Sequence, residues 1–148
     1  MRALAFTILL AGCGGEEESA RADGLENKVE APAQPPPSAE DAALSSDAAA
    51  SLRLYYDHLA RREWRAAFAM RASAPGLTLE RFAANYERYE AYLATVGAPS
   101  LPARQDGAVW VQIPVQLYGR MRDGSPFGSV GMMVLRREER GGRWTILS

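Results

Sequence analysis

The sequence predicts an α+β domain in which N-terminal helices pack against a curved antiparallel sheet, preceded by a cleaved signal and a disordered linker. Apolar residues recur with helical spacing in the middle of the chain, and after residue 108 they alternate with polar residues. Glycine-containing turns separate the alternating segments. We therefore expect a signal at residues 1–12, a linker at 13–44 and the folded domain at 45–148.

The first twelve residues have the parts of a secretory signal, with Arg2, an apolar run over residues 3–10 and small residues before Cys13. A run of about eight apolar residues is too short to cross ~30 Å of hydrocarbon, which needs about 20. Leu10-Ala11-Gly12-Cys13 resembles the lipobox of bacterial lipoproteins. The resemblance implies cleavage before Cys13, diacylglycerol on its sulfur and usually a further acyl chain such as palmitate on its amine. A cleaved signal without lipid is the alternative.

The same resemblance predicts where the protein resides. Gly14 follows the cysteine, in place of the aspartate that favours inner-membrane retention in lipoproteins of two-membrane bacteria. We therefore expect a lipid-anchored protein of the bacterial cell envelope, on the periplasmic face of the outer membrane where the host has two membranes. Cys13 is the only cysteine, so a domain whose one thiol carries lipid must fold without a disulfide.

The linker at 13–44 has little to bury. It contains Glu16-Glu17-Glu18 and Pro35-Pro36-Pro37, a composition that favours disorder with polyproline II character. The domain that follows has arginines but no lysine and is basic, whereas the linker is acidic. This balance allows anionic lipid or an acidic wall polymer as a partner, although a solvated surface explains it as well. We expect no nucleic acid partner, because the basic residues do not cluster with exposed aromatic residues.

Three helices are expected at the start of the domain. Ser45-Ser46-Asp47 offers capping oxygens, and the first helix then buries one face. A break at 61–63 leads to a second helix over 64–72, and Thr78 caps a third. Segment 92–96 is either the last turn of the third helix or a first strand, and the strand is favoured. The apolar positions of the first and third helices are Leu52, Tyr55, Tyr56 and Leu59, and Leu79, Phe82, Ala83, Tyr86 and Leu93.

Strands follow from residue 108. Residues 109–117 alternate, with Val109, Val111, Ile113, Val115 and Leu117 on one face. Pro114 has no amide N–H, so it requires a bulge or a position that faces no neighbour. Asp123-Gly124 predicts a hairpin turn into a strand over 127–138. Gly141-Gly142 then turns the chain into a closing strand over 143–147.

Two stretches carry a second resemblance. Tyr55-Tyr56-Asp57-His58-Leu59 followed by Trp64-Arg65-Ala66-Ala67-Phe68 resembles the opening helices of the nuclear transport factor 2-like superfamily. The Asp123-Gly124 hairpin and the segment 142–146 are similar to its last strands. The resemblance covers about 46–147 and implies a cone, in which a bent sheet wraps over helices. That fold hosts isomerases, cyclases, secretion-channel components and interaction modules, so it does not decide the function.

No catalytic constellation is found. Enzymes of this superfamily place an Asp or His base inside the cone, but Asp57 and His58 fall off the apolar stripe of the first helix, and the apolar strand face offers no acid. Scattered acids and one histidine lack metal-ligand spacing, and we expect no cofactor. A pocket, if present, is expected to be lined by Tyr55, Tyr56, Phe82 and Tyr86. A partner or dimer contact is expected on the sheet face that carries Trp110, Gln112, Gln116 and Tyr118.

These observations predict a membrane-tethered, non-catalytic module that binds an envelope protein, a wall polymer or a small apolar ligand. The alternatives are an isomerase- or cyclase-type enzyme, which an open pocket converging on Asp57 or Glu90 would favour, and an accessory subunit of an envelope assembly.

Overall fold

The computed structural model describes residues 36–147, so the lipobox and most of the predicted linker lie outside the described residues. None of the helices within 36–147 is long and apolar enough to span a membrane. The elements follow in the order α1 (Ala39–Ala60), α2 (Trp64–Ala69), α3 (Leu79–Glu87), β1 (Tyr89–Val96), β2 (Ala103–Gln105), β3 (Ala108–Met121), β4 (Pro126–Glu138) and β5 (Thr145–Ile146).

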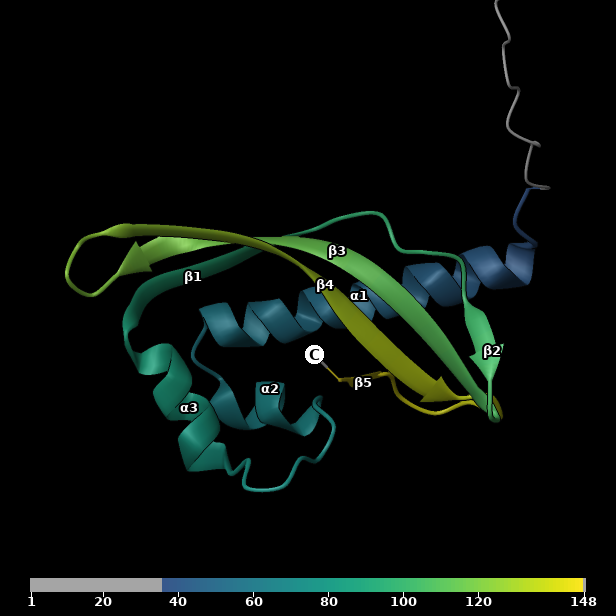
Figure 1. The fold of residues 1–148 in the computed structure, drawn as a ribbon, viewed down its shortest axis with the longest axis horizontal. Helices are drawn as coiled ribbons and strands as arrows, with labels where there is room; N and C mark the ends of the chain where they lie inside the picture. Colours follow the sequence, from purple (N-terminus) through teal and green to yellow (C-terminus); the bar gives the residue numbers. More distant parts are fainter. Residues whose placement is uncertain (1–35, 148) are drawn as a thin grey trace, which may run out of the picture. The chain divides into compact units, whose positions relative to one another are not determined.

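The strands form one antiparallel sheet in the order β1-β3-β4-β5. The short β2 pairs with the first residues of β3, whereas β1 pairs with its second half. The sheet curves, and the helices lie on its concave side (Figure 1). The β3–β4 hairpin runs in continuous register from Ala108↔Glu138 to Arg120↔Pro126. The predicted Asp123-Gly124 turn is confirmed, with the Ser125 N–H donating to Asp123 Oδ1 at 2.9 Å. Helices followed by an antiparallel meander are the predicted fold class.

The predicted start of the domain at residue 45 is wrong, because α1 begins at Ala39. Ser38 is its N-cap and accepts the Asp41 N–H at 3.1 Å. Glu40 and Asp41 lie in the first turn, where carboxylates favour the helix dipole, and Arg104 from β2 donates to both. Ser45 therefore does not cap the helix. It is buried, and its hydroxyl donates to the Ser100 carbonyl at 2.9 Å.

The predicted break between the first two helices is confirmed, and Arg62 adopts a φ of 61° there. The α2 helix ends at Ala69, three residues before the predicted end at 72. Thr78 caps α3 as predicted, accepting the Arg81 N–H at 3.2 Å. Segment 92–96 is strand, as favoured, and β1 begins three residues earlier at Tyr89.

Two positions allow the close approach of β1 to β3. Gly119 has a φ of 154°, and a Cβ built there would lie 2.1 Å from the Ala91 carbonyl oxygen, opposite the bulge in β1. The Pro114 carbonyl accepts a hydrogen bond from the Gly97 N–H at 2.9 Å. The Pro114 nitrogen points to the same side as this carbonyl, towards Gly97, which lies just after the end of β1. Proline is therefore placed where no ladder donor is missing.

The core lies between the concave face of the sheet and the helices. The predicted inward residues of β3 are buried from Val109 to Val115, and Leu117 is half-buried. The closing strand is shorter than predicted, but it links two parts of the fold. Ile146 pairs with Leu135 of β4. Its N–H also donates to the Met70 carbonyl, and its carbonyl accepts the Ala72 N–H, both in the segment after α2. This contact fixes the end of α2 to the sheet.

Candidate functional site

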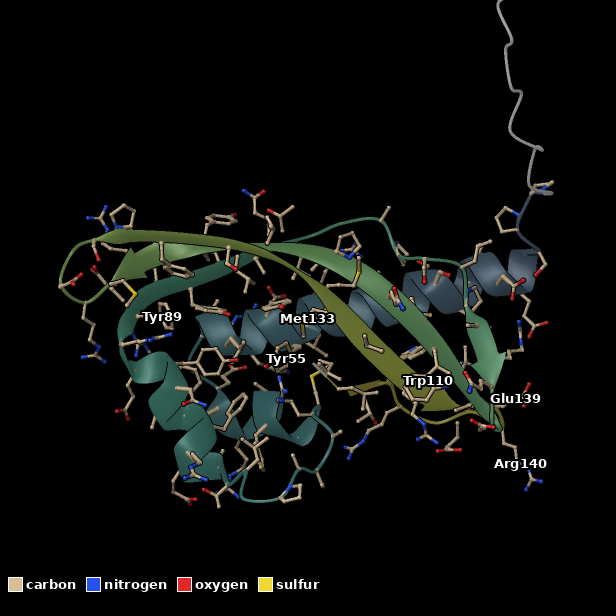
Figure 2. The ribbon with its side chains drawn as sticks, viewed as in Figure 1. Tyr55, Tyr89, Trp110, Met133, Glu139 and Arg140 are labelled. Carbon is tan, nitrogen blue, oxygen red and sulfur yellow. The ribbon has the colours of Figure 1, made fainter. Side chains whose placement is uncertain are left out.

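The inside of the cone is filled by aromatic side chains. Tyr55, Tyr56 and Phe82 are only 1%, 6% and 2% exposed, and Tyr86 is half-buried. Phe82 and Tyr86 have ring centroids 5.2 Å apart, and Tyr86 contacts Tyr92 at 5.1 Å. The four residues predicted to line a pocket are thus brought together, but as packed core. Figure 2 shows Tyr55 within the curve of the sheet.

A short polar chain runs through this core. The Tyr55 and Tyr86 hydroxyls lie 3.2 Å apart, and Arg71 Nη1 donates to the Tyr55 hydroxyl at 3.3 Å. Burial raises the pKa of Tyr56 and of Tyr86 well above the usual value, and it raises the pKa of Tyr92 to about 12. These tyrosines are therefore neutral hydrogen-bonding groups at physiological pH, and none is a phenolate base.

Little empty space remains among the aromatic residues. The cavity bounded by Trp64, Tyr86 and Tyr92 has a volume of about 10 Å³, which is about the space of one water molecule. A typical small-molecule site has roughly 300–1,000 Å³. The aromatic side chains therefore fill the part of the cone that Trp64, Tyr86 and Tyr92 bound.

The acid and base candidates do not converge inside the cone. Asp57 is exposed and, together with Tyr56 and Tyr118, lines an open groove of about 450 Å³ between α1 and β1, so of the candidates it is the one that faces a pocket beside tyrosines. His58 lies at the rim, where its ring nitrogen contacts the Glu63 carboxylate. Glu90 is exposed and faces Arg120. Among residues 36–147 no group of three metal-ligating side chains comes together.

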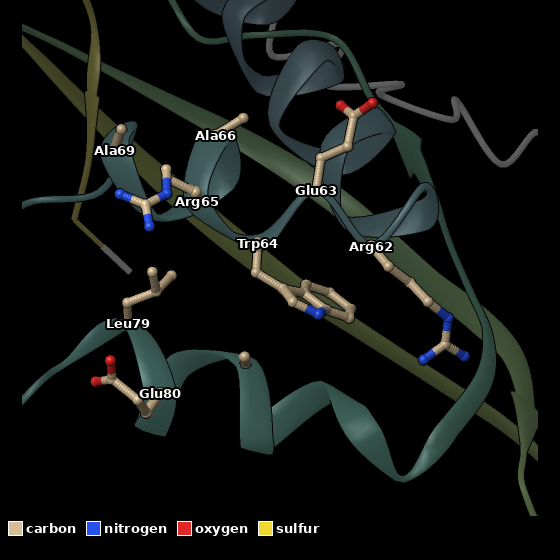
Figure 3. Close-up of a pocket in the computed structure, with 9 residues that line it drawn as sticks. Arg62, Glu63, Trp64, Arg65, Ala66, Ala69, Leu79 and Glu80 are labelled. Atoms are coloured by element: carbon tan, nitrogen blue, oxygen red, sulfur yellow. The ribbon is translucent and has the colours of Figure 1, made fainter.

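A groove that the sequence did not predict lies between α2 and α3 and has a volume of about 820 Å³ (Figure 3). Its apolar lining comes from Trp64, Leu79 and three alanines, and charged side chains such as Arg65 and Glu80 lie at its edge. The Trp64 indole stacks on Tyr86 with centroids 5.9 Å apart. The indole is half-buried and shares the groove with the three small alanines.

The convex face of the sheet exposes apolar side chains from three adjacent strands. Leu93 of β1 is 43% exposed, Tyr118 of β3 is 40% exposed, and Val130 and Met132 of β4 are 81% and 52% exposed. Gln112 and Gln116 are also exposed on this face, as predicted. Trp110 is half-buried, because the Arg136 guanidinium lies over its ring at 5.7 Å. The predicted partner face is thus an outward surface, and it extends onto β1 and β4.

Solved structures share this arrangement of a curled sheet over helices. One is named as the beta subunit of an aromatic-ring-hydroxylating dioxygenase from Novosphingobium aromaticivorans, with a TM-score of 0.53 and 11% identity over 71% of this chain and 85% of that one. The domain has the nuclear transport factor 2-like fold. A second structure, the Kfla4162 protein of Kribbella flavida, has a TM-score of 0.53 and 12% identity over 72% of this chain and 88% of that one.

No family model and no curated protein matches the sequence. At identities of 11% and 12%, the two solved structures establish the nuclear transport factor 2-like fold and nothing about activity.

Proposed function

We propose that the protein is a lipid-anchored, non-catalytic module of the bacterial envelope that docks a partner protein on the convex face of its sheet. The observation that carries the proposal is the contrast between the two sides of the sheet. Inside the cone, the space among Trp64, Tyr86 and Tyr92 is only about 10 Å³, whereas the convex side leaves Tyr118, Val130 and Met132 exposed.

The shape and chemistry of the convex face favour a protein as the partner. Small ligands bind in concave sites, whereas Val130 and Met132 are exposed on the outer side of β4, outside the groove that Leu93 and Tyr118 line with α1. It combines aromatic and apolar side chains with neutral amides, and charged residues such as Arg120 and Arg136 lie towards its two ends. Protein interfaces commonly have an apolar and aromatic centre with a polar rim.

A photocrosslinking amino acid at Gln112, in the middle of the face, tests the docking. We expect it to give a discrete adduct in intact cells, because the side chain is exposed among the uncovered residues. Ala84, which is exposed on α3, is the matched control and should not give that adduct. Identical adduct patterns at both positions, or none at Gln112, would contradict the proposal. An adduct between two copies of the chain would identify the face as a dimer contact.

The lipid anchor is tested separately. Cys13→Ser removes the thiol that the lipobox resemblance implies is acylated, so we expect the protein to move from the membrane fraction to the soluble envelope fraction. Two or more acyl chains anchor stably, whereas one is marginal. A variant that remains fully membrane-bound would exclude Cys13 as the anchor.

The groove between α2 and α3 favours a small apolar ligand as a second candidate. Ala83 lies in its wall, so Ala83→Phe should fill the groove and reduce binding of an apolar fluorescent dye. Ala84→Phe, one residue further along α3 and exposed, should leave the dye affinity unchanged. Equal dye binding in both variants would rule out the groove.

A further inference from the structure

The two edges of the sheet are protected very differently. The β1 edge is flanked by α1, which places the charged side chains of Arg53 and Asp57 in the groove beside it. On the opposite edge, β5 covers β4 only at Leu135 and Arg136, and the Leu147 N–H adds one bond to Val134 at 2.9 Å. Within the described chain, residues 127–133 of β4 pair with β3 on one side and with no strand on the other.

This open edge lacks the features that usually prevent strand pairing. Natural edge strands carry charges, prolines or a covering element. From Phe127 to Val134, β4 contains no charged residue and no proline. Gly128, Ser129, Val130, Gly131 and Met132 are exposed in succession, although they alternate between the two faces of the sheet. The backbone between Gly128 and Met132 is therefore accessible at this edge, whereas Phe127 and Met133 at its two ends are half-buried.

The register identifies the backbone groups that face outward. Because the Val134 carbonyl points to Leu147 and away from β3, alternation directs the N–H and C=O of Gly128, Val130 and Met132 away from β3 as well. These three residues present a row of donors and acceptors along the free edge.

We propose that this edge pairs with the same edge of a second copy, antiparallel and with the two-fold axis at Val130. The pairing is self-complementary in its side chains. Met132 lies opposite the partner's Gly128, where the absent side chain leaves room for it, and Val130 lies opposite the partner's Val130. On the other face Phe127 and Met133 of each copy stay packed on their own domain, Phe127 against Tyr89 and Met133 against the core, so they do not obstruct the pairing.

The backbone completes the match. In this register Gly128 pairs with the partner's Met132, Val130 with the partner's Val130, and Met132 with the partner's Gly128. Each is a hydrogen-bonded pair that exchanges two bonds. The two sheets become one, and their convex faces form one continuous surface. This contact does not depend on the proposed docking of a partner protein, because the backbone edge forms it and the face remains free.

Sedimentation of the full chain in detergent, over a range of concentrations, tests the proposal with two matched lysine variants. Val130 and Gln116 are cross-strand neighbours on the same face, but Val130 is on the edge strand and Gln116 is on the central one. We expect a dimer for the wild type and for Gln116→Lys. Val130→Lys places two like charges directly opposite each other and should raise the dimer dissociation constant at least about tenfold.

Val130→Pro is the second edge variant. This substitution removes an N–H that points away from β3, so every hydrogen bond between β4 and β3 is kept. We therefore expect an unchanged far-UV circular dichroism spectrum and a weaker dimer. A chain that stays monomeric at about 100 μM, above the micromolar range of weak specific contacts, would overturn the proposal. So would a dimer that Gln116→Lys weakens as much as Val130→Lys does, because both residues lie on the convex face and equal sensitivity moves the contact from the edge to that face.

Discussion

Asp47 offers a sharp test of how α1 is held to the sheet. Its Oδ2 accepts the Trp144 Nε1–H at 2.9 Å and a bond from Arg137 Nη1 at 3.0 Å. The Arg137 side chain is only 18% exposed, and its buried Nε has no hydrogen-bond partner within the described residues. Asp47→Ala therefore leaves a mostly buried guanidinium without its carboxylate.

The expected loss follows from these contacts. A hydrogen bond to a charged group contributes about 1.5–3 kcal/mol, but the Asp47 side chain is 56% exposed, so solvent screens part of the attraction. We expect Asp47→Ala to lower the free energy of unfolding by about 2 kcal/mol, and a loss of this size lowers the melting temperature by about 8 °C in a domain of roughly 100 residues. Trp144→Phe removes one donor and reduces the core packing, and it should cost about 2 kcal/mol.

Urea unfolding followed by far-UV circular dichroism measures both variants and the double variant. Because the two residues share a hydrogen bond, the double variant should lose about 1 kcal/mol less than the sum of the single losses. Glu87→Ala, at an exposed position on α3, is the control and should change stability by less than about 0.5 kcal/mol. Strict additivity of the two losses would refute a direct bond between Asp47 and Trp144.

Three further predictions concern the sheet and the core. Gly119→Ala should destabilise the domain by more than about 1 kcal/mol in the same urea assay, because the new Cβ would clash with the Ala91 carbonyl; a neutral effect would show that the bulge can move. Ile113→Ala, at a fully buried site, should cost about 2–5 kcal/mol, whereas Gln112→Ala beside it should cost little; equal losses would contradict the assigned strand faces. Burial raises the pKa of Tyr92 to about 12 in the folded state, whereas an unfolded tyrosine loses its phenolic proton near pH 10. The free energy of unfolding should therefore be independent of tyrosine ionisation below about pH 10 and should fall between about pH 10 and 12. Spectrophotometric titration of the tyrosines, compared with unfolding at each pH, checks this, and a constant stability between pH 10 and 12 would contradict it.

The sequence predicts those parts of the fold that local patterns specify. Alternation over 109–117 identifies the buried face of β3, and the cap at Thr78 and the Asp123-Gly124 turn depend on neighbouring residues alone. The start of α1 was missed although Ser38, Glu40 and Asp41 form a local signal, because Ser45-Ser46-Asp47 offered a similar signal closer to the apolar stripe. Ser45 and Asp47 instead form hydrogen bonds with Ser100 and Trp144, which are distant in the sequence.

What local patterns do not contain is the pairing of distant segments. Tyr89 and Tyr92 fit the end of a helix as well as a strand, and the pairing of β1 with β3 decides between them. The bond between Asp47 and Trp144 joins residues 97 positions apart. The tyrosines predicted to line a pocket do lie together inside the cone. Whether such side chains line a cavity or fill it depends on how closely α3 and β1 approach α1, which the sequence pattern does not specify.

The position of Trp144 and Ile146 in the sequence has a consequence for how the domain is made. Both are core residues, and Ile146 joins the sheet to the backbone after α2, yet every other core residue precedes them. A polypeptide that is still being synthesised therefore cannot complete this hydrophobic core until both residues have been added. Up to that point the described domain lacks two buried side chains and the Ile146 hydrogen bonds that join the sheet to the segment after α2.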